Sequence, residues 1–297
     1  MPTAPLKLII LTGSDTPHVR HGWAALRPWL AEQPNVSLVG EFSPSQPIPP
    51  NLDADMVVVL GGDGSILRGC RQLGARQLPI LGINLGRLGF LADLSPQEFQ
   101  AGLHLLCSGH YSIVEHLMFQ CIHQSSDGMV HCDLGLNEVT ITSGGSFKML
   151  DIDLRIDDEE VTTFSCDGLI ISTPVGSTAH NLSAGGPILR QELQVFVITP
   201  ICPHTLTVRP IVDSASRTYR LRVKESPPGV MLVIDGQIRR PLMADDHVLV
   251  QRAQPTLKLV RLPGHSYYGT LHRKLGWQGQ LDYRERRGIR QTGEHGE

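Results

Sequence analysis

A glycine-rich turn with a carboxylate at its centre, Gly61-Gly62-Asp63-Gly64-Ser65, is the segment of the sequence best suited to chemistry. It follows an apolar run and precedes a segment with helical spacing of apolar residues. Glycines let the backbone approach a ligand closely, and the N–H groups that begin a helix bind anions. Gly61, Gly62 and Ser65 are therefore predicted to cradle phosphates. Asp63 repels phosphates, so its carboxylate suits holding a metal ion or accepting a proton from an attacking hydroxyl.

A structural explanation of the same turn is about equally good on these residues alone. Asp-Gly is favourable turn chemistry between a strand and a helix. The turn is not a P-loop, because no Gly-Lys-Ser/Thr follows it. The earlier turn Thr12-Gly13-Ser14-Asp15 also lacks the G-x-G-x-x-G spacing of a dinucleotide-binding fingerprint.

Other polar residues have both a functional and a structural interpretation. Asn137 offers a donor and an acceptor, which suits a ribose or purine edge, and Glu138 can accept bonds from hydroxyls. Taken alone, this pair is better explained as ordinary polarity on a strand. Asp235-Gly236 fits a hairpin turn, and Lys148 fits an exposed strand end.

The elements that must position these residues differ between the two parts of the chain. Up to about residue 110, apolar runs alternate with segments of helical periodicity, which predicts an open parallel sheet with helices on its faces. Beyond it, short β-rich runs dominate and predict a mainly β domain. The expected strands of the first part are 6–11, 36–42, 56–60 and 79–83, and its expected helices are 18–32 and 65–76. The expected organisation is an α/β domain at 1–110, a β-rich domain at 111–262, a helical segment at 263–280 and a disordered tail at 281–297.

Composition excludes several classes of function. A net charge of -3 gives no electrostatic reason to expect nucleic acid or an anionic membrane as a partner. The six cysteines form no C-x-x-C pair, and the 13 histidines show no H-E-x-x-H or zinc-finger spacing. No signal-peptide pattern and no membrane-length apolar run is present, so a soluble, cytoplasmic protein is predicted.

Several ordered motifs together resemble the NAD kinase family. The turn at 61–65 is similar to the G-G-D-G-[ST] motif that NAD kinases share with 6-phosphofructokinases and with diacylglycerol and sphingosine kinases. Later segments narrow the resemblance to NAD kinases, and it spans about residues 6 to 277. These segments are Gly82–Leu91, Leu136–Val139, Asp167–Pro187, Pro203–Leu206 with Arg209-Pro210, Asp235–Gln237 and Arg273–Trp277.

The resemblance implies an enzyme that transfers a phosphoryl group from ATP to the adenosine 2'-hydroxyl of NAD, giving NADP. Polyphosphate as donor and NADH as acceptor stay open at this point. The resemblance also implies Mg2+ or another divalent cation, a cleft between the two domains, and a homodimer or homotetramer. No protein side chain is predicted as a direct metal ligand.

The same resemblance assigns roles to individual residues. Asp63 is expected to be the general base beside the 2'-hydroxyl, with Gly64 and Arg68 flanking the dinucleotide. Asn137 and Glu138 are expected to bind the ribose and adenine region. Lys148, Asp167 and Gln237 fall where other NAD contacts of the family lie, and Asp167 is a candidate for the site of a neighbouring chain. Ser165 is expected near the nicotinamide. Val175 is a further expected NAD contact. The adenosine half is expected to contact Thr178, Ala179, His180, Asn181, Leu182 and Ser183.

Three positions depart from the commonest family pattern. Ser65 replaces Thr and keeps the hydroxyl. Val175 stands where Thr is common and removes a hydrogen-bonding group. His180 stands where Tyr is common, and its smaller ring predicts altered packing against the dinucleotide with the chemistry intact.

Two rival functions remain open at this point. A sugar or lipid kinase on the same G-G-D-G scaffold explains 61–65 but not 167–187. A weakly active NADP(H)-binding sensor is conceivable because of Val175 and His180, although Asp63 argues against it.

Overall fold

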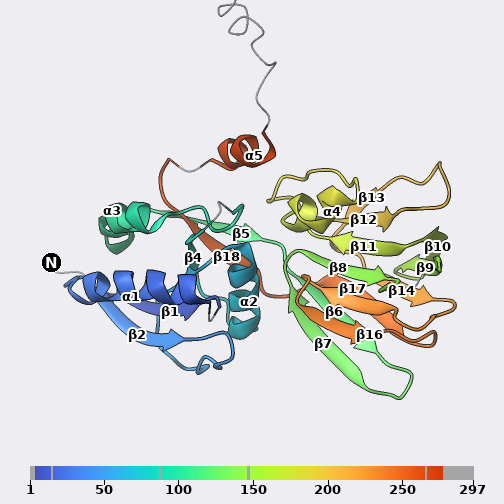
Figure 1. The fold of residues 1–297 in the computed structure, drawn as a ribbon, viewed down its shortest axis with the longest axis horizontal. Helices are drawn as coiled ribbons and strands as arrows, with labels where there is room; N and C mark the ends of the chain where they lie inside the picture. Colours follow the sequence, from blue (N-terminus) through green and yellow to red (C-terminus); the bar gives the residue numbers. More distant parts are fainter. Residues whose placement is uncertain (1–3, 15, 87–88, 146–147, 265, 277–297) are drawn as a thin grey trace, which may run out of the picture. The chain divides into compact units, whose positions relative to one another are not determined.

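The apolar runs of the first part form a six-stranded sheet, here called the N-terminal sheet, within the residues that the computed structural model describes (Figure 1). Those residues are 4–14, 16–86, 89–145, 148–264 and 266–276. The strands of the sheet, in spatial order, are β2 (Val36–Phe42), β1 (Leu6–Thr12), β3 (Met56–Leu60), β4 (Ile80–Ile83), β18 (Leu257–Arg261) and β5 (Ser112–His116). Neighbouring strands are parallel from β2 to β18, and β5 is antiparallel to β18.

Helices pack on both faces of this sheet, which explains why every residue of β3 is buried. Helices α1 (Pro17–Ala31) and α3 (Pro96–Cys107) share one apolar cluster with Val58. Helix α2 (Asp63–Leu73) shares another cluster with Val57 and Val59, on the opposite face. The alternation of β3 side chains therefore fixes α2 on one side, with its first residue at the carboxyl end of the strand.

The outcome for this domain differs from the expected parallel sheet in one respect. The predicted strands at 6–11, 36–42, 56–60 and 79–83 are all present. However, β5 and β18, which lie in the range 111–262, also belong to the N-terminal sheet and make it mixed. The pairing of β18 with β4 joins residues about 180 positions apart, as in Leu259 with Ile80. Local periodicity carries no information about such a pairing.

The strands between β5 and β18 form two six-stranded antiparallel sheets, here called the β domain. The first sheet, in spatial order, contains β10 (Glu159–Cys166), β9 (Leu150–Ile156), β14 (Tyr219–Val223), β17 (His247–Arg252), β6 (Phe119–Gln124) and β7 (Val130–Gly135). The second contains β13 (Ile211–Ser214), β12 (Val195–Ile201), β11 (Gly168–Ser172), β8 (Glu138–Thr142), β15 (Met231–Ile234) and β16 (Ile238–Pro241).

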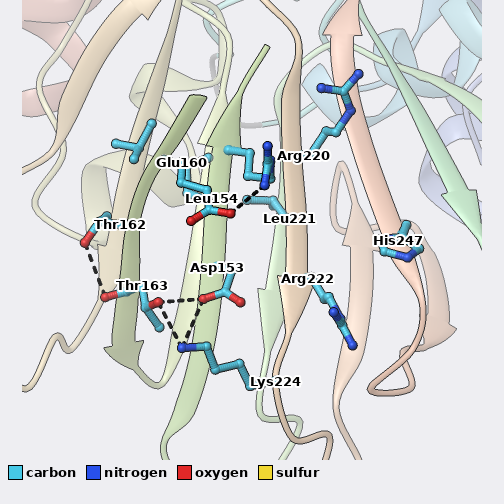
Figure 2. A pocket seen from close by; sticks show the side chains of 12 residues that line it. Asp153, Leu154, Glu160, Thr162, Thr163, Arg220, Leu221, Arg222, Lys224 and His247 are labelled. Atoms are coloured by element: carbon cyan, nitrogen blue, oxygen red, sulfur yellow. Dashed lines mark hydrogen bonds and ion pairs between the residues drawn. The ribbon is translucent and has the colours of Figure 1, made fainter. Parts of the chain in front are cut away.

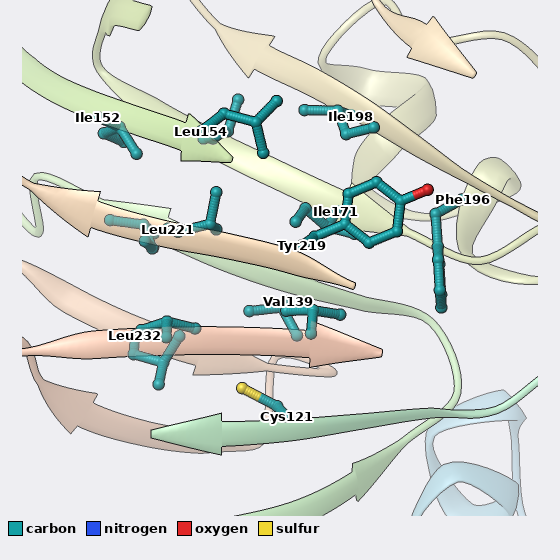
Figure 3. Packing of buried hydrophobic residues seen from close by; sticks show 14 of the residues in the cluster. Cys121, Val139, Ile152, Leu154, Ile171, Phe196, Ile198, Tyr219, Leu221 and Leu232 are labelled. Atoms are coloured by element: carbon teal, nitrogen blue, oxygen red, sulfur yellow. The ribbon is translucent and has the colours of Figure 1, made fainter. Parts of the chain in front are cut away.

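The two sheets of the β domain enclose one apolar core (Figure 3). Val139 and Ile171 come from one sheet, and Leu154 and Leu221 come from the other. The rings of Phe196 and Tyr219 meet edge to face at 5.5 Å. This core supports β8 from behind, so the segment that precedes β8 is attached to a rigid layer.

Three short elements complete the described chain. The 3-10 turn η1 (Gly176–Thr178) and helix α4 (His180–Ser183) follow β11, and helix α5 (Tyr267–Leu275) lies in the range predicted to be helical. The described residues up to Pro263 form one compact unit, and those from Gly264 form a second. The predicted tail at 281–297 lies outside the described residues. Within the described part, no helix has both the length and the apolar character needed to cross a membrane.

Candidate active site

The glycine-rich turn joins β3 to α2 and places Asp63 as the first residue of that helix. Gly61 has φ +142°, a conformation that L side chains rarely adopt, and its N–H bonds to the Ile83 carbonyl at 2.9 Å. The first N–H groups of a helix have no intrahelical acceptor, so those near Gly62 and Gly64 are available to an anion. The helix dipole also favours a negative side chain at this end.

The carboxylate of Asp63 is held by three backbone N–H groups from a distant loop. Phe90 N–H donates to Oδ2 at 2.8 Å, and Leu91 and Ala92 N–H donate to Oδ1, each at 3.0 Å. A carboxylate offers about four acceptor sites, so roughly one is left for a further partner. Asp63 is therefore fixed in orientation before any substrate binds. No local pattern indicates this anchoring, because 27 or more residues separate the partners.

Gly89 makes the close approach of that loop possible. A Cβ at Gly89 would lie 1.9 Å from Asp63 Oδ1. We expect Gly89→Ala to displace the carboxylate and lower kcat about 100-fold, since a shift of about 1 Å at a reacting group costs that much. Gly86→Ala in the same loop is the matched control, because its Cβ meets only Asn84 Oδ1 at 4.0 Å. Steady-state kinetics on both variants provide the measurement. Equal kcat values would show that Asp63 does not depend on Gly89.

Ser65 and Arg68 tie α2 to the turn after β1. A Cβ at Gly13 would lie 1.9 Å from Ser65 Oγ, so these two turns touch and a side chain at position 13 is excluded. Arg68 Nη1 donates to the Gly13 carbonyl. Ser65 therefore fills a tight space, and Arg68 braces the neighbouring turn. A contact of Arg68 with dinucleotide phosphates stays a prediction.

Glu138 begins β8 with a buried carboxyl group, only 6% exposed. Its pKa is raised to about 8, mainly by burial and then by the negative charge of Asp235, while the backbone N–H of His180 acts in the opposite direction. Its Oε2 atom has no hydrogen-bond partner among the described residues. A buried carboxyl that keeps its proton near neutral pH and has one unmatched oxygen is suited to donate a hydrogen bond to a ligand.

The segment 136–138 is connected to α2 through the turn of the β15–β16 hairpin. Asp235 in that turn accepts the N–H of Asn137 at 2.8 Å, and its Oδ2 lies 3.0 Å from Arg71 Nη1 of α2. Gln237, also predicted from the resemblance, donates from Nε2 to the Gly64 carbonyl at 2.9 Å. The predicted segments 61–65 and 136–138 are thus brought together. Arg71 was missed, because Arg68 was the arginine that the family pattern singled out.

The predicted adenosine-contacting segment follows β11 and lies beside Asn137. Thr173 N–H donates to the Asn137 carbonyl at 2.9 Å. Asn181 is fully buried, and its amide donates to the Ser177 and Pro187 carbonyls at 3.2 and 3.1 Å and accepts from Thr199 at 2.7 Å. Its side chain therefore shapes the loop from within. Of the other predicted contacts in this segment, Val175 is buried in an apolar cluster, Ser183 is exposed, and the rest are half-buried: Thr178, Ala179 and Leu182.

The exposed ring of His180 lies at the start of α4. A tyrosine there would add stacking area and a phenolic donor. We expect His180→Tyr to lower KM for NAD several-fold with kcat unchanged. Measurement of both constants decides this, and an unchanged KM would remove His180 from the packing role.

Ser165 and Asp167 lie at another place in the β domain. Ser165 Oγ donates to Asp151, and Asp167, which is exposed, bonds through its N–H to the Ile201 carbonyl at 2.9 Å. Within the described chain, neither makes a hydrogen bond or ion pair with the residues around Asp63. Lys148 lines a cavity of about 300 Å³ together with Asp151. If these residues contact NAD as predicted, the dinucleotide reaches them across some distance or on another chain.

A hollow of about 670 Å³ lies on the outward face of β9, β10 and β14 (Figure 2). Opposite charges alternate across it: Lys224 Nζ lies 3.4 Å from Asp153 Oδ1, and Arg155 Nη1 lies 2.6 Å from Glu160 Oε1. The hollow shares no residue with the surroundings of Asp63. The remaining arginines, Arg220 and Arg222, pair with Asp158 and Asp245 outside the hollow, so it is best explained as a solvated sheet face.

Comparisons with known proteins agree with this arrangement. Residues 50–111 match the model of the ATP-NAD kinase N-terminal domain, and residues 136–262 match that of the ATP-NAD kinase C-terminal domain. The chain is 45% identical over 281 residues to an NAD kinase of Rhodopirellula baltica, covering 95% of this chain and 90% of that protein. It is 41% identical over 224 residues to an NAD kinase of Geobacter metallireducens, covering 75% of this chain and 79% of that protein.

Two solved structures share the fold. Yeast NADH kinase complexed with NADH matches with a TM-score of 0.85 at 23% identity, covering 95% of this chain and 90% of that one. At that identity the likeness concerns the fold alone. An NAD kinase from Archaeoglobus fulgidus in complex with ATP matches with a TM-score of 0.71 at 28% identity, covering 92% of this chain and 100% of that one. The predicted architecture, an α/β domain with a mainly β domain, is confirmed, and the chain belongs to the NAD kinase family.

Proposed function

We propose that this chain transfers the terminal phosphoryl group of ATP to the adenosine 2'-hydroxyl of NAD and so produces NADP. The observation that carries the proposal is the joining of two segments: the Asp63 turn and the 136–138 segment are held together through Arg71 and Asp235. One segment supplies an oriented carboxylate, and the other supplies groups that match a ribose. This is the pair of functions that phosphorylation of a sugar hydroxyl requires.

Asp63 orients the attacking hydroxyl and accepts its proton. Phosphoryl transfer passes through a loose transition state, so positioning and charge stabilisation provide most of the catalysis. The base therefore needs a fixed direction more than a high pKa. Three N–H bonds give Asp63 that direction, and its remaining acceptor site is the one that faces substrate.

Glu138 and Asn137 hold the ribose of the acceptor. With its pKa near 8, the Glu138 carboxyl is mostly protonated at neutral pH and donates from its unmatched oxygen. Asn137 supplies a side-chain amide, while its backbone is fixed by Asp235 and Thr173. The donor phosphates bind at the free N–H groups that begin α2.

A divalent cation fits this site only in part. No group of three His, Cys, Asp or Glu side chains within the described residues is arranged to hold a metal ion. Asp63 keeps roughly one acceptor site, so a cation such as Mg2+ would take most of its ligands from the phosphates and water. When bound, it supplies neutralisation of charge on the donor phosphates.

The assembly and the location of the protein form part of the same proposal. We infer a homodimer or homotetramer in which Asp167, exposed and away from Asp63, serves the site of a neighbouring chain. We infer a cytoplasmic location, where NAD and ATP are both available. Polyphosphate is a second candidate donor.

The test is incubation of the purified protein with NAD, ATP and Mg2+, followed by an NADP-specific enzymatic assay. We expect NADP to accumulate with time and with enzyme concentration. Parallel reactions with NADH, fructose 6-phosphate and diacylglycerol separate NAD kinase from the sugar and lipid kinases of the same scaffold. Tight binding of NADP without turnover would support the sensor and contradict the proposal.

A further inference from the structure

Arg71 lies where helix α2 meets the turn of the β15–β16 hairpin. Its Nη1 atom is 3.0 Å from Asp235 Oδ2, and its Nη2 atom donates to the side-chain oxygen of Gln237. The Arg71 side chain is 16% exposed and that of Asp235 is 0% exposed. A guanidinium that meets two partners with its planar fork fixes their relative orientation, which a lysine does not reproduce.

Gln237 carries the connection back to the start of the same helix. Its Nε2 atom donates to the Gly64 carbonyl at 2.9 Å. Gly64 adjoins Asp63, and Arg71 lies about two helical turns further along. The hairpin turn thus bonds to α2 at two points, Gly64 and Arg71. A tilt or slide of α2 relative to the hairpin would break one of these bonds.

Asp235 carries the connection to the opposite side. Its carboxylate accepts the N–H groups of Leu136, Asn137 and Glu138 at 3.0, 2.8 and 3.2 Å. Asp235 has φ +50° and Gly236 has φ +65°, and the Gln237 N–H closes the turn on Ile234 at 2.9 Å. Three residues, 235 to 237, connect the paired Ile234 and Ile238, and the turn tolerates Asp at its first position, where most side chains are strained. The hairpin therefore presents a carboxylate at a fixed place.

We propose that Arg71 is a positioning residue for phosphoryl transfer, which holds Asp63 on α2 in register with the acceptor-binding segment 136–138. The inference rests on the proposed function. Arg71 acts through Asp235 and Gln237 and has no assigned contact with substrate. Loss of its two bonds leaves the Gln237–Gly64 bond as the remaining hydrogen bond between the hairpin turn and α2, so α2 can shift relative to 136–138 and misalign Asp63 with the hydroxyl of a bound acceptor.

A second arginine offers a matched comparison. Arg240 on β16 pairs with Asp133 on β7 at 2.6 and 3.1 Å, and the two side chains are 21% and 15% exposed. The chemistry resembles that of Arg71 with Asp235, although Asp133 is less buried than Asp235. Both elements belong to the β domain, and neither bears Asp63. Arg240→Met therefore removes an arginine–aspartate pair and leaves both bonds of Arg71, to Asp235 and Gln237, in place.

The experiment compares wild type, Arg71→Met, Arg71→Lys and Arg240→Met as full chains. We expect Arg71→Met to lower kcat about 30- to 100-fold with KM for NAD within about threefold, because misplacement of about 1 Å acts on the chemical step. Arg71→Lys keeps a positive charge beside Asp235 and loses the hydrogen bond to Gln237, so its kcat should lie between those of wild type and Arg71→Met. It also serves if Arg71→Met does not fold. Arg240→Met should lower the unfolding temperature with kcat and KM unchanged.

Hydrogen exchange of the peptide that contains 136–138 gives a measurement that does not depend on turnover. We expect faster exchange there in Arg71→Met and no change in Arg240→Met. If the wild-type protein made no NADP, the proposed function would be wrong. The hydrogen-exchange result would still decide whether Arg71 holds the segment 136–138. Unchanged exchange, or kcat equal to wild type in folded Arg71→Met, would overturn the inference. A rise in KM alone would instead make Arg71 a binding residue.

Discussion

Asp63→Asn should lower kcat for NADP formation by about 10²- to 10⁴-fold, the usual contribution of a positioned general base, with NAD still bound. The amide is close in size to the carboxylate and keeps one oxygen for the N–H groups of Leu91 and Ala92. Its other end cannot accept from the Phe90 N–H, so the protein should also lose some stability. Single-turnover kinetics and NAD titration by calorimetry separate the loss of chemistry from the loss of binding.

Asp246 supplies the control for this experiment. Its carboxylate also accepts backbone N–H groups, from Ser126 at 2.8 Å and Met243 at 2.9 Å, and it pairs with His123 inside the β domain. Asp246→Asn should therefore lower stability in a similar way and leave kcat unchanged. If Asp63→Asn and Asp246→Asn behaved alike in both respects, Asp63 would be a structural residue only, and the sensor would be the better function.

The stability of the protein should depend on pH through Glu138. Its pKa in the folded protein is raised from 4.5 to about 8, first by burial and then by the charge of Asp235. A carboxyl with a raised pKa favours the folded state while it is protonated. Its contribution is fully present below pH 4.5 and is lost as pH rises through about 8.

Glu138→Gln isolates this contribution because glutamine cannot ionise. Between pH 5 and pH 8 we expect the free energy of unfolding of the variant, relative to wild type, to rise by about 1.4 kcal/mol per pH unit. Urea unfolding at several pH values in this window measures the difference. Glu159→Gln, at an exposed position of β10, is the control and should show no such slope. A pH-independent difference for Glu138→Gln would mean that the folded protein accommodates the Glu138 charge.

Local pattern was sufficient for most of the N-terminal sheet. The unbroken apolar run at 56–60 predicts a strand buried on both faces, and β3 is such a strand. The spacing of Ile66, Leu67, Cys70 and Leu73 predicts the apolar face of α2. The first three are buried, and Leu73 is partly buried against the same cluster. The Asp235-Gly236 hairpin also follows from residue type, because both residues need positive φ. These features depend on neighbours in sequence, which a single chain displays directly.

The parts that sequence reasoning missed all depend on distant neighbours. Nothing near Asp63 indicates that the loop at 90–92 will surround its carboxylate. Arg68 and Arg71 are both arginines on the same helix. Only the fold decides that Arg71 bonds to Asp235 and Arg68 to Gly13. The sequence shows Asp235 in a predicted hairpin turn and Arg71 on a predicted helix of the other domain. Nothing in it indicates that these two side chains pair.

Because β18 lies beside β4, the protein cannot be divided into two folded halves by a single cut of the chain. The chain leaves the N-terminal sheet after β5 and returns to it as β18, so the β domain is an insertion between two strands that lie next to each other. A fragment that ends near residue 110 lacks both strands and exposes an apolar edge at β4, which invites aggregation. Cutting the gene at one point therefore yields no self-sufficient half, and the two domains should melt together rather than in sequence.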